Sequence, residues 1–500
     1  MARLAHLLHV RKSVAILVCA VLVISAISAI AHLRSTPDDR MESASPEPSE
    51  PSGTDELAEE EHTADSEARE AAEITKARAA AFDAARVVGQ IGLQRPIRSV
   101  PNPGWTVEHV WSATDDDWEP AIAADPNAPF VYALATRYTL PRRCHGCEVP
   151  SIILRVSPDD GRTWRNDRFL CRCPGITNGQ YDPIIEVDGV GTIHAVWLQG
   201  YSPGVVYSRS DDHGRTWTIP VPMPVAWSDK PQLAVSADGQ DVYVDMNGPS
   251  HGDSRVAVSH DGGASFSLVR VTDDERYNFA GGAWTSADGQ HVAFAQTSYD
   301  QHYRGRIHAD LALSDDGGAT WRSVRVATGD RQPDCTSDGC PDGYYGPTPA
   351  LAGDPNGNLL YVYAANDAPR TPQRVFLTLS TDDGDTWGTP IPVSPKGANA
   401  IFPAATSGGP GDFRVWWMDT RRGAWNVWYT STTDGGKTWS APVRLSNAVS
   451  GEPYKSRRGF AEAYGDYGEI DVTDTGATIA IWGEGASYAG PGQVWFTRQR

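Results

Sequence analysis

Six copies of one eight-residue pattern, S/T-x-D-x-G-x-T/S-W/F, recur between residues 157 and 439 of a chain of 500 residues. Self-similarity at intervals of roughly 50 residues is typical of solenoids, propellers and arrays, in which each repeat is one supersecondary unit. The pattern therefore constrains the fold more than any other feature of the chain. The glycines of the six copies are Gly161, Gly214, Gly263, Gly318, Gly384 and Gly436.

The residue types of the pattern suit a tight turn between two strands. Glycine permits the positive φ of such a turn, and aspartate accepts backbone N–H bonds inside it. The Thr or Ser hydroxyl adds a local bond, and the aromatic residue begins the next strand by packing on its neighbour. Together with 17 Trp, 48 Gly and 36 Pro, the pattern predicts an all-β protein of many short strands joined by turns.

On these six copies the chain resembles the BNR, or Asp-box, repeat proteins of the sialidase superfamily, over roughly residues 105–500. The resemblance implies a β-propeller. It also implies that each Asp-box lies in the turn between the third and fourth strands of a blade, away from the ligand face. Residues of the boxes are therefore expected to be scaffold.

The number of blades follows from the strands around the boxes. Each box is preceded by a strand that often carries proline near its start, and by a second strand after a turn. A seventh unit, without a box, ends after its third strand. Segment 105–113, WTVEHVWSA, is a spare strand at the other end, and pairing it with the last strand would close the ring. The sequence predicts seven blades, with six, the number in sialidase enzymes, as the alternative.

The chain before the repeats begins with a candidate membrane segment. Residues 13–31 are uncharged and apolar, and they follow a short basic segment, residues 1–12. This arrangement predicts one transmembrane helix with its N-terminus in the cytoplasm. A cleaved signal peptide is the alternative, because Ala29-Ile30-Ala31 forms an Ala-x-Ala site.

Residues 32–90 are expected to form an acidic linker rich in Pro, Ser and Glu, with a short helix at its end. Between Pro37 and Glu73 stand 14 acidic residues and two basic ones. Such a segment cannot bury enough apolar surface to offset the entropy lost on ordering, so we expect a spacer. The propeller, residues 105–500, would then stand outside the cytoplasm on a single-pass membrane anchor, or be secreted if the N-terminal helix is cleaved.

Charge restricts the partners. The chain has 43 basic and 63 acidic residues, a formal net charge of −20, which disfavours nucleic-acid binding. No P-loop and no GxGxxG between a strand and a helix is present, so nucleotide chemistry has no support. The partners we expect are a glycan or another extracellular ligand, and the membrane through the N-terminal helix.

Six cysteines outside the apolar segment predict disulfide bonds, since an even set outside the cytoplasm is typical of them. A four-thiolate zinc site is the alternative, because the first four form CxxC and CxC pairs. The six are Cys144, Cys147, Cys171, Cys173, Cys335 and Cys340.

Propellers bind ligands at one mouth of the central channel, through the loops before each first strand and after each second strand. The resemblance implies a Tyr nucleophile assisted by Glu, an Asp acid/base, and arginines that bind the substrate carboxylate. The candidates for catalysis are Tyr467, Glu462, Asp182 and Asp229. The candidates for substrate binding are Arg137, Arg304, Arg421, Asp419, Asp466, Tyr181 and Glu484.

Two readings of function stay open at this point. The sialidases carry their first arginine in a Phe/Tyr-Arg-Ile-Pro motif, and here the nearest string, residues 94–98, has another order. The sequence thus predicts either an exo-sialidase-like glycoside hydrolase that recognises a glycan, or a non-catalytic propeller that binds a ligand or a protein. No cofactor is expected, apart from a Ca²⁺ ion that Asp182, Asp229, Asp245 and Asp466 could hold.

Overall fold

The computed structural model describes most of the repeat region and two helical residues before it, Lys76 and Ala80. The described ranges are 102–112, 114–139, 149–170, 179–200, 202–225, 229–247, 253–272, 279–301, 304–331, 349–366, 368, 371–423, 425–446, 455–456, 459–460, 468–485 and 492–500. The predicted membrane segment 13–31, all seven cysteines and the linker apart from the two helical residues lie outside these ranges. No helix within the described ranges is long and apolar enough to cross a membrane.

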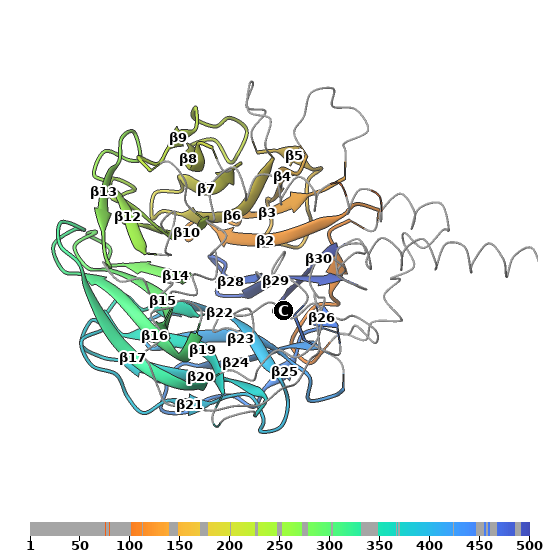
Figure 1. The fold of residues 1–500 in the computed structure, drawn as a ribbon. Helices are drawn as coiled ribbons and strands as arrows, with labels where there is room; N and C mark the ends of the chain where they lie inside the picture. The colour runs from red at the N-terminus through yellow and green to blue at the C-terminus, as the bar shows by residue number, and fades with distance from the viewer. Residues whose placement is uncertain are drawn as a thin grey trace, which may run out of the picture. The chain divides into compact units, whose positions relative to one another are not determined.

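The repeat region forms seven four-stranded antiparallel sheets, which we call blades 1 to 7 in chain order (Figure 1). Blade 1 has β2 (Asp117–Ala124), β3 (Val131–Arg137), β4 (Ser151–Ser157) and β5 (Arg168–Phe169); blade 2 has β6 (Gln180–Val187), β7 (Ile193–Gln199), β8 (Gly204–Ser210) and β9 (Val221–Pro222); blade 3 has β10 (Asp229–Val235), β11 (Val242–Asn247), β12 (Ser254–Ser259) and β13 (Ser267–Arg270). Blade 4 has β14 (Phe279–Thr285), β15 (Val292–Gln301), β16 (Arg304–Ser314) and β17 (Arg322–Arg331); blade 5 has β18 (Ala350–Gly353), β19 (Leu359–Asn366), β20 (Gln373–Ser380) and β21 (Ile391–Pro392); blade 6 has β22 (Ala400–Gly409), β23 (Asp412–Asp419), β24 (Asn426–Thr432) and β25 (Val443–Arg444).

Blade 7 closes the ring with strands from both ends of the repeat region. It contains β28 (Gly468–Val472), β29 (Thr478–Gly485) and β30 (Gly492–Arg498), and its fourth strand is β1 (His109–Val110). His109 pairs with Phe496, and Trp105 forms an isolated bridge with Gln499. The prediction of a seven-bladed propeller closed by the segment near Trp105 is confirmed. A short hairpin, β26 (Lys455–Ser456) and β27 (Gly459–Phe460), stands between blades 6 and 7 in the chain.

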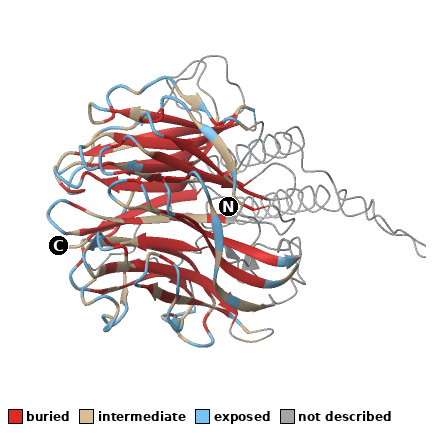
Figure 2. Cartoon of the chain, turned by 90° about the vertical axis from the view of Figure 1, so that its left-hand side faces the viewer, coloured by how far each residue is buried: buried red, intermediate tan, exposed pale blue. Residues whose placement is uncertain are grey.

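The core lies between neighbouring blades. In Figure 2 the strands that cross the molecule are mostly buried, and the exposed residues gather at the turns. Leu154 of blade 1 packs in one cluster with Trp197 and Val206 of blade 2, and Trp416 of blade 6 shares a cluster with Trp482 of blade 7. Since each blade buries its faces against its neighbours, no blade has a complete core alone.

The six Asp-box turns follow the third strand of blades 1 to 6, as the resemblance implied, and they repeat one set of hydrogen bonds. In blade 1 the Ser157 hydroxyl accepts the N–H of Gly161 at 2.8 Å, and Asp159 accepts both the N–H and the hydroxyl of Thr163 at 2.7 Å. The equivalent glycine N–H to hydroxyl bonds of the other five boxes measure 2.9 to 3.1 Å. We call this side of the propeller the turn face.

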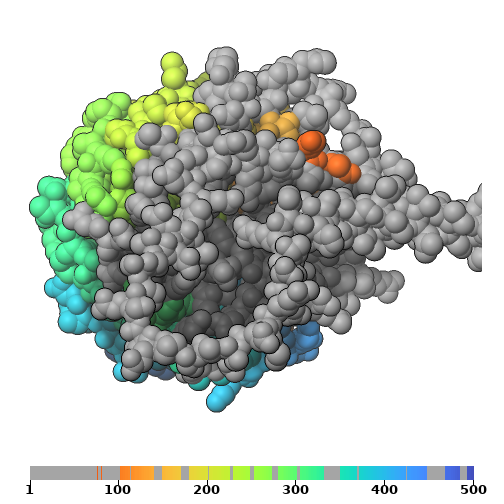
Figure 3. Space-filling model, in the orientation of Figure 1, coloured from red at the N-terminus to blue at the C-terminus, as the bar shows by residue number. Residues whose placement is uncertain are grey.

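The opposite side is the face at which inner strands begin and second strands end, and we call it the mouth. Antiparallel pairing brings these ends together: Asp117 pairs with Arg137 in blade 1, and Gln180 with Gln199 in blade 2. Figure 3 looks onto the mouth, with the described residues of blades 2 to 6 along its coloured rim. Arg500 lies on the turn face, at the left of Figure 2.

Candidate functional site

The inner strands share an irregularity at their mouth ends. In five blades the ladder between the inner and second strands shifts by one residue, between Trp118 and Ala121 in blade 1 and at equivalent places in blades 2, 3, 4 and 6. A bulge of this kind bends a strand and redirects a side chain, and it is common next to ligand sites. We call these places the mouth bulges.

Four mouth bulges hold a non-glycine residue in the left-handed region, each followed by proline. They are Glu119, Asp182, Lys230 and Phe402, with φ of 51°, 50°, 52° and 49°. This conformation costs roughly 1–3 kcal/mol for a residue other than glycine, least for Asp and Asn. Strained residues are concentrated at functional sites, so the four positions are candidates for function.

The four residues differ in how far their side chains are buried. Phe402 belongs to the apolar cluster between blades 5, 6 and 7, so at blade 6 the bulge serves packing. Glu119 and Lys230 are buried, whereas Asp182 is half-buried and keeps access to solvent. Glu119 accepts the backbone N–H of Asp182 at 3.1 Å, which joins blade 1 to blade 2 at the mouth.

Blades 1 to 3 therefore present a continuous set of charged residues, which we call the acidic arc: Glu119, Asp182, Asp229 and Lys230. Asp229 is half-buried and accepts the N–H of Lys230 at 2.8 Å, and it stands opposite Asn247 in the strand register. Three carboxylates and one ammonium group give the arc a negative charge. Tyr181 lies directly before it, buried, with its ring 6.4 Å from the ring of Tyr138.

Arg137, at the end of β3, is bound by carboxylates of its own blade. Its Nε donates to Asp117 Oδ1 at 2.6 Å, its Nη2 to Asp117 Oδ2 at 2.9 Å, and its Nη1 contacts Asp167 Oδ2 at 2.8 Å. Burial raises the pKa of Asp117 to about 6, although the charge of Arg137 acts against it. Burial alone would lower the pKa of Arg137, but the three nearby carboxylates outweigh it and raise that pKa. The guanidinium is neutralised within the blade.

Arg421 is held in the same way at the end of β23. Its Nε donates to both oxygens of Asp419 at 2.9 Å, and Trp417 Nε1 donates to the same carboxylate at 2.8 Å. The guanidinium carbon lies 3.9 Å from the ring centre of Trp428. Two predicted substrate-binding residues, Arg421 and Asp419, are thus in contact with each other, and this arginine is sandwiched between a carboxylate and an aromatic ring.

The second strands of three blades end in one motif, a tryptophan whose indole N–H binds the side chain two residues on. The pairs are Trp197 with Gln199, Trp417 with Asp419, and Trp482 with Glu484, at 2.9, 2.8 and 2.8 Å. Burial raises the pKa of Glu484 to about 7. The motif fixes the acceptor groups at the mouth end of each strand.

Asp245 and the predicted calcium site can now be placed. The buried Asp245 carboxylate accepts Gln296 Nε2 at 2.7 Å and the Ser254 hydroxyl at 3.0 Å, and burial raises its pKa to about 7. Among the residues that the structure describes, no three His, Cys, Asp or Glu side chains are grouped to hold a metal ion. Calcium stays a prediction, because Asp466, one of its four proposed ligands, lies outside the described ranges.

Three acidic side chains that are not among the predicted site residues lie on the inner strands of blades 2 and 7. Glu469 Oε2 accepts the N–H of Ile122 at 2.6 Å, and Asp471 Oδ2 accepts that of Ala124 at 2.7 Å, so both bind the inner strand of blade 1. Loss of hydration raises the pKa of Asp471 to about 6 and that of Glu469 well above its usual value. The side chain of Glu186 is exposed, and it lies close enough to neighbouring groups that loss of hydration and the charge of Asp471 raise its pKa to about 8.

Four other predicted site residues lie where the structure says nothing of their side chains. Tyr467, Glu462 and Asp466 are outside the described ranges, and for Arg304, the first residue of β16, only the backbone is described. Their catalytic and binding roles stay predictions.

The ring of seven blades with six Asp-box turns defines the class of fold as a β-propeller. Residues 144–336 match the family model described as a BNR repeat-like domain. The resemblance to the BNR repeat proteins is thus confirmed over these residues, and the described repeat region is a seven-bladed β-propeller.

Comparison with solved structures gives distant likenesses. A protein of unknown function from Dyadobacter fermentans is 14% identical, with a TM-score of 0.46, over 79% of this chain and 99% of its own. YCF48 bound to a D1 peptide is 12% identical, with a TM-score of 0.43, over 80% of this chain and 98% of its own. The NanB sialidase of Streptococcus pneumoniae is 12% identical, with a TM-score of 0.43, over 77% of this chain and 68% of its own. No curated protein matches the sequence.

Proposed function

We propose that this protein is an extracytoplasmic propeller that recognises a glycan at its mouth, with the acidic arc in contact with the sugar. The observation that carries the proposal is the set of strained mouth bulges in three successive blades, which hold Glu119, Asp182 and Lys230 at one edge of the mouth. Polar groups fixed by a rigid scaffold are the usual means of orienting a ligand in a shallow site.

The charge of the arc supports a neutral or amino sugar as the contacting unit. Sugar hydroxyls and ammonium groups donate hydrogen bonds, and the carboxylates of Asp182 and Asp229 are acceptors that keep access to solvent. A sialic acid carboxylate would meet these negative charges. It would also need free arginines, whereas Arg137 and Arg421 are already bound to Asp117 and Asp419.

A glycan array probed with the full chain tests this proposal. We expect binding to neutral or amino-sugar glycans, and Asp182→Asn should reduce it at least tenfold, since hydrogen bonds to a charged acceptor contribute roughly 1.5–3 kcal/mol. Binding confined to sialylated glycans would contradict the proposal, as would wild-type binding by Asp182→Asn.

A second candidate function, glycoside hydrolysis, is favoured by one contact. Glu119 Oε2 accepts the backbone N–H of Asp182, so two acidic residues of neighbouring blades are in contact at the mouth. Most glycoside hydrolases use two carboxyl groups, one as acid and one as base or nucleophile. Turnover of a fluorogenic glycoside that is lost in Glu119→Gln but retained in Asp383→Asn, a change on the turn face, would establish it. If the protein binds glycans but hydrolyses neither neutral glycosides nor sialosides, it is a non-catalytic propeller that recognises a glycan.

A further inference from the structure

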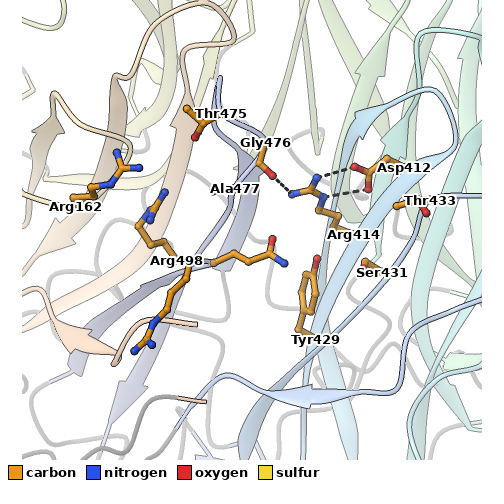
Figure 4. A pocket seen from close by; sticks show the side chains of 12 residues that line it. Arg162, Asp412, Arg414, Tyr429, Ser431, Thr433, Thr475, Gly476, Ala477 and Arg498 are labelled. Atoms are coloured by element: carbon orange, nitrogen blue, oxygen red, sulfur yellow. Dashed lines mark hydrogen bonds and ion pairs between the residues drawn. The ribbon is translucent and has the colours of Figure 1, made fainter. Parts of the chain in front are cut away.

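A pocket of about 440 Å³ opens on the turn face where blades 6, 7 and 1 meet. Its lining includes four arginines, Arg162, Arg414, Arg498 and Arg500, and one acidic residue, Asp412. Figure 4 shows Arg162 and Arg498 on one side of the pocket, with Arg414 and Tyr429 on the other. The volume is within the range of small-ligand pockets.

Arg414, on the blade 6 side of the pocket, already has hydrogen-bond partners for its guanidinium. Arg414 donates to both oxygens of Asp412 at 3.1 and 2.7 Å, to the carbonyl of Gly476 at 2.9 Å and to the hydroxyl of Thr478 at 2.8 Å. It forms a wall of the pocket and has little capacity for a ligand.

Arg498, on the opposite side, is different. The residue is 7% exposed, its Nε is buried without a partner, and within the described residues its guanidinium makes no hydrogen bond or ion pair. Loss of hydration, and then the positive charge of Arg162, lower the pKa of Arg498, and Asp160 and Asp159 do not cancel these effects. A buried donor without a partner is costly, so this guanidinium has the capacity to bind a ligand or an ion in the pocket.

The repeat explains why this arginine stands out. In every blade the first apolar residue of the second strand pairs with the last residue of the third strand. In blades 1, 2 and 6 these pairs are Val131 with Ser157, Ile193 with Ser210 and Phe413 with Thr432, and each partner is the first residue of an Asp-box. In blade 7 the pair is Ile479 with Arg498. A guanidinium therefore occupies the position at which the other six blades carry the hydroxyl that holds the box.

We propose that this pocket binds a tetrahedral oxyanion, a phosphate or sulfate group, with Arg498 as its main ligand. Arg162 is a second donor, because its Nη1 binds Asp160 at 2.8 Å and the rest of its guanidinium makes no bond within the described residues. Ser431, Thr433 and Gln499 add hydroxyl and amide donors to the lining. The forked guanidinium suits two oxygens of such an anion.

Thermal melting of the full chain at constant ionic strength tests the proposal, with inorganic phosphate, sulfate and glycerol 3-phosphate as probes and chloride as the reference. We expect a saturable rise of Tm with the oxyanions beyond that in chloride. Arg498→Gln should abolish this rise while leaving the Tm in chloride equal or higher, because it removes a buried N–H donor that has no partner. A larger response to glycerol 3-phosphate than to inorganic phosphate would identify a phosphate ester, and the reverse a free anion.

Two matched variants complete the test. Arg162→Gln should raise the oxyanion concentration at half effect about tenfold. Arg215→Gln should not change it, because Arg215 stands at the same box position in blade 2 but outside the pocket. An equal rise of Tm in chloride, an unchanged response in Arg498→Gln, or equal effects of the two box-arginine variants would overturn the proposal. If Arg498→Gln fails to fold, the contrast between Arg162→Gln and Arg215→Gln decides the question.

Discussion

The side chains of the repeated units are nearly the same in blades 1 to 6 on the turn face, but they differ from blade to blade at the mouth. On the turn face, six boxes repeat one set of hydrogen bonds, and the Thr or Ser hydroxyl lies 2.5 to 2.7 Å from the box aspartate in all six. At the mouth, one backbone distortion holds Glu119, Asp182, Lys230 and Phe402 in different blades. Because the box turns repeat the same residue types and bonds, we infer that they hold the fold together. The mouth bulges share one backbone geometry but carry different side chains, which indicates that several blades contribute to one binding site.

Residues with positive φ also differ between the two faces of the propeller. In the box turns, Asp160, His213 and Asp383 occupy the position at which other boxes have Gly262, Gly317 or Gly435. Glycine and non-glycine residues are interchangeable there because the turn requires only positive φ. At the mouth bulges, three neighbouring blades hold charged residues in this conformation despite the strain.

The largest effect on stability is expected at the mouth, from Arg137→Met. The change leaves the fully buried carboxylate of Asp117 without its main partner, which costs roughly 3–5 kcal/mol. Because Asp117 can be protonated, with a pKa of about 6 even beside Arg137, the loss should be smaller at pH 5 than at pH 8. Urea denaturation at both pH values measures it. Equal losses at both values would show that Arg137 contributes mainly by packing.

On the turn face, Gly263→Ala should destabilise the fold by roughly 2–5 kcal/mol. A methyl group there would lie 2.0 Å from Cε1 of the buried Tyr207 ring, in a backbone with φ of +80°. Gly435→Ala is the matched control, since nothing lies within 4 Å of its Cβ position at φ of +69°. It should cost about 1 kcal/mol. Similar losses in the two variants would mean that backbone strain, and not the contact with Tyr207, sets the cost.

The acids of the two regions should respond to pH in opposite directions. Bonds from Thr and Ser lower the pKa of Asp212, Asp261 and Asp434 in the boxes to about 2. Their contribution is present above pH 4, the value for the unfolded chain, and is lost as the pH falls towards 2. On the inner and second strands the shifts are upward: Glu186, near the end of β6, has a pKa raised to about 8, and Asp245 of β11 has one raised to about 7. Their contribution is complete below pH 4 and is lost as the pH rises through 7 and 8.

These opposite shifts predict a maximum of Tm near pH 4, with a fall towards pH 8. Scanning calorimetry from pH 3 to pH 9 measures the profile. Glu186→Gln should flatten the fall on the alkaline side, whereas Asp211→Asn, an exposed change on the turn face, should leave it intact. A Tm that rises steadily from pH 5 to pH 8 would contradict the assignment.

The smallest effect is expected for Gly435→Asp. Asp160 and Asp383 adopt φ of 57° and 55° at the same box position, and the Cβ position at Gly435 is open. We expect a change within about 0.5 kcal/mol in urea denaturation. A loss as large as that for Gly263→Ala would show that the boxes are not equivalent.

The sequence predicted the fold well because the relevant signals are local and repeated. The six boxes specify their own turns, and the spare strand near Trp105 pairs with β30 as expected. The sequence also placed Asp182 and Asp229 at the mouth, because both stand at the start of a first strand.

The remaining features of the site depend on contacts between distant parts of the chain. Ion pairing of Arg421 with Asp419 depends on a turn that periodicity does not reveal, and the bonds from Glu469 and Asp471 to blade 1 span 347 residues. The recurring proline at the starts of first strands was the signal that could have revealed the mouth bulges. Blade 7 lacks a box, but nothing in the sequence indicated that Arg498 replaces the box hydroxyl.

The claim that the glycan binds at the mouth and not at the Asp-box turns is tested most directly by one paired measurement. Asp182 and Asp383 are both left-handed aspartates, with φ of 50° and 55°, on opposite faces. We predict that glycan binding by the full chain, measured by calorimetry with the best glycan from an array, is weakened at least tenfold by Asp182→Asn and unchanged by Asp383→Asn. Equal affinities of the two variants, or a loss confined to Asp383→Asn, would contradict the account.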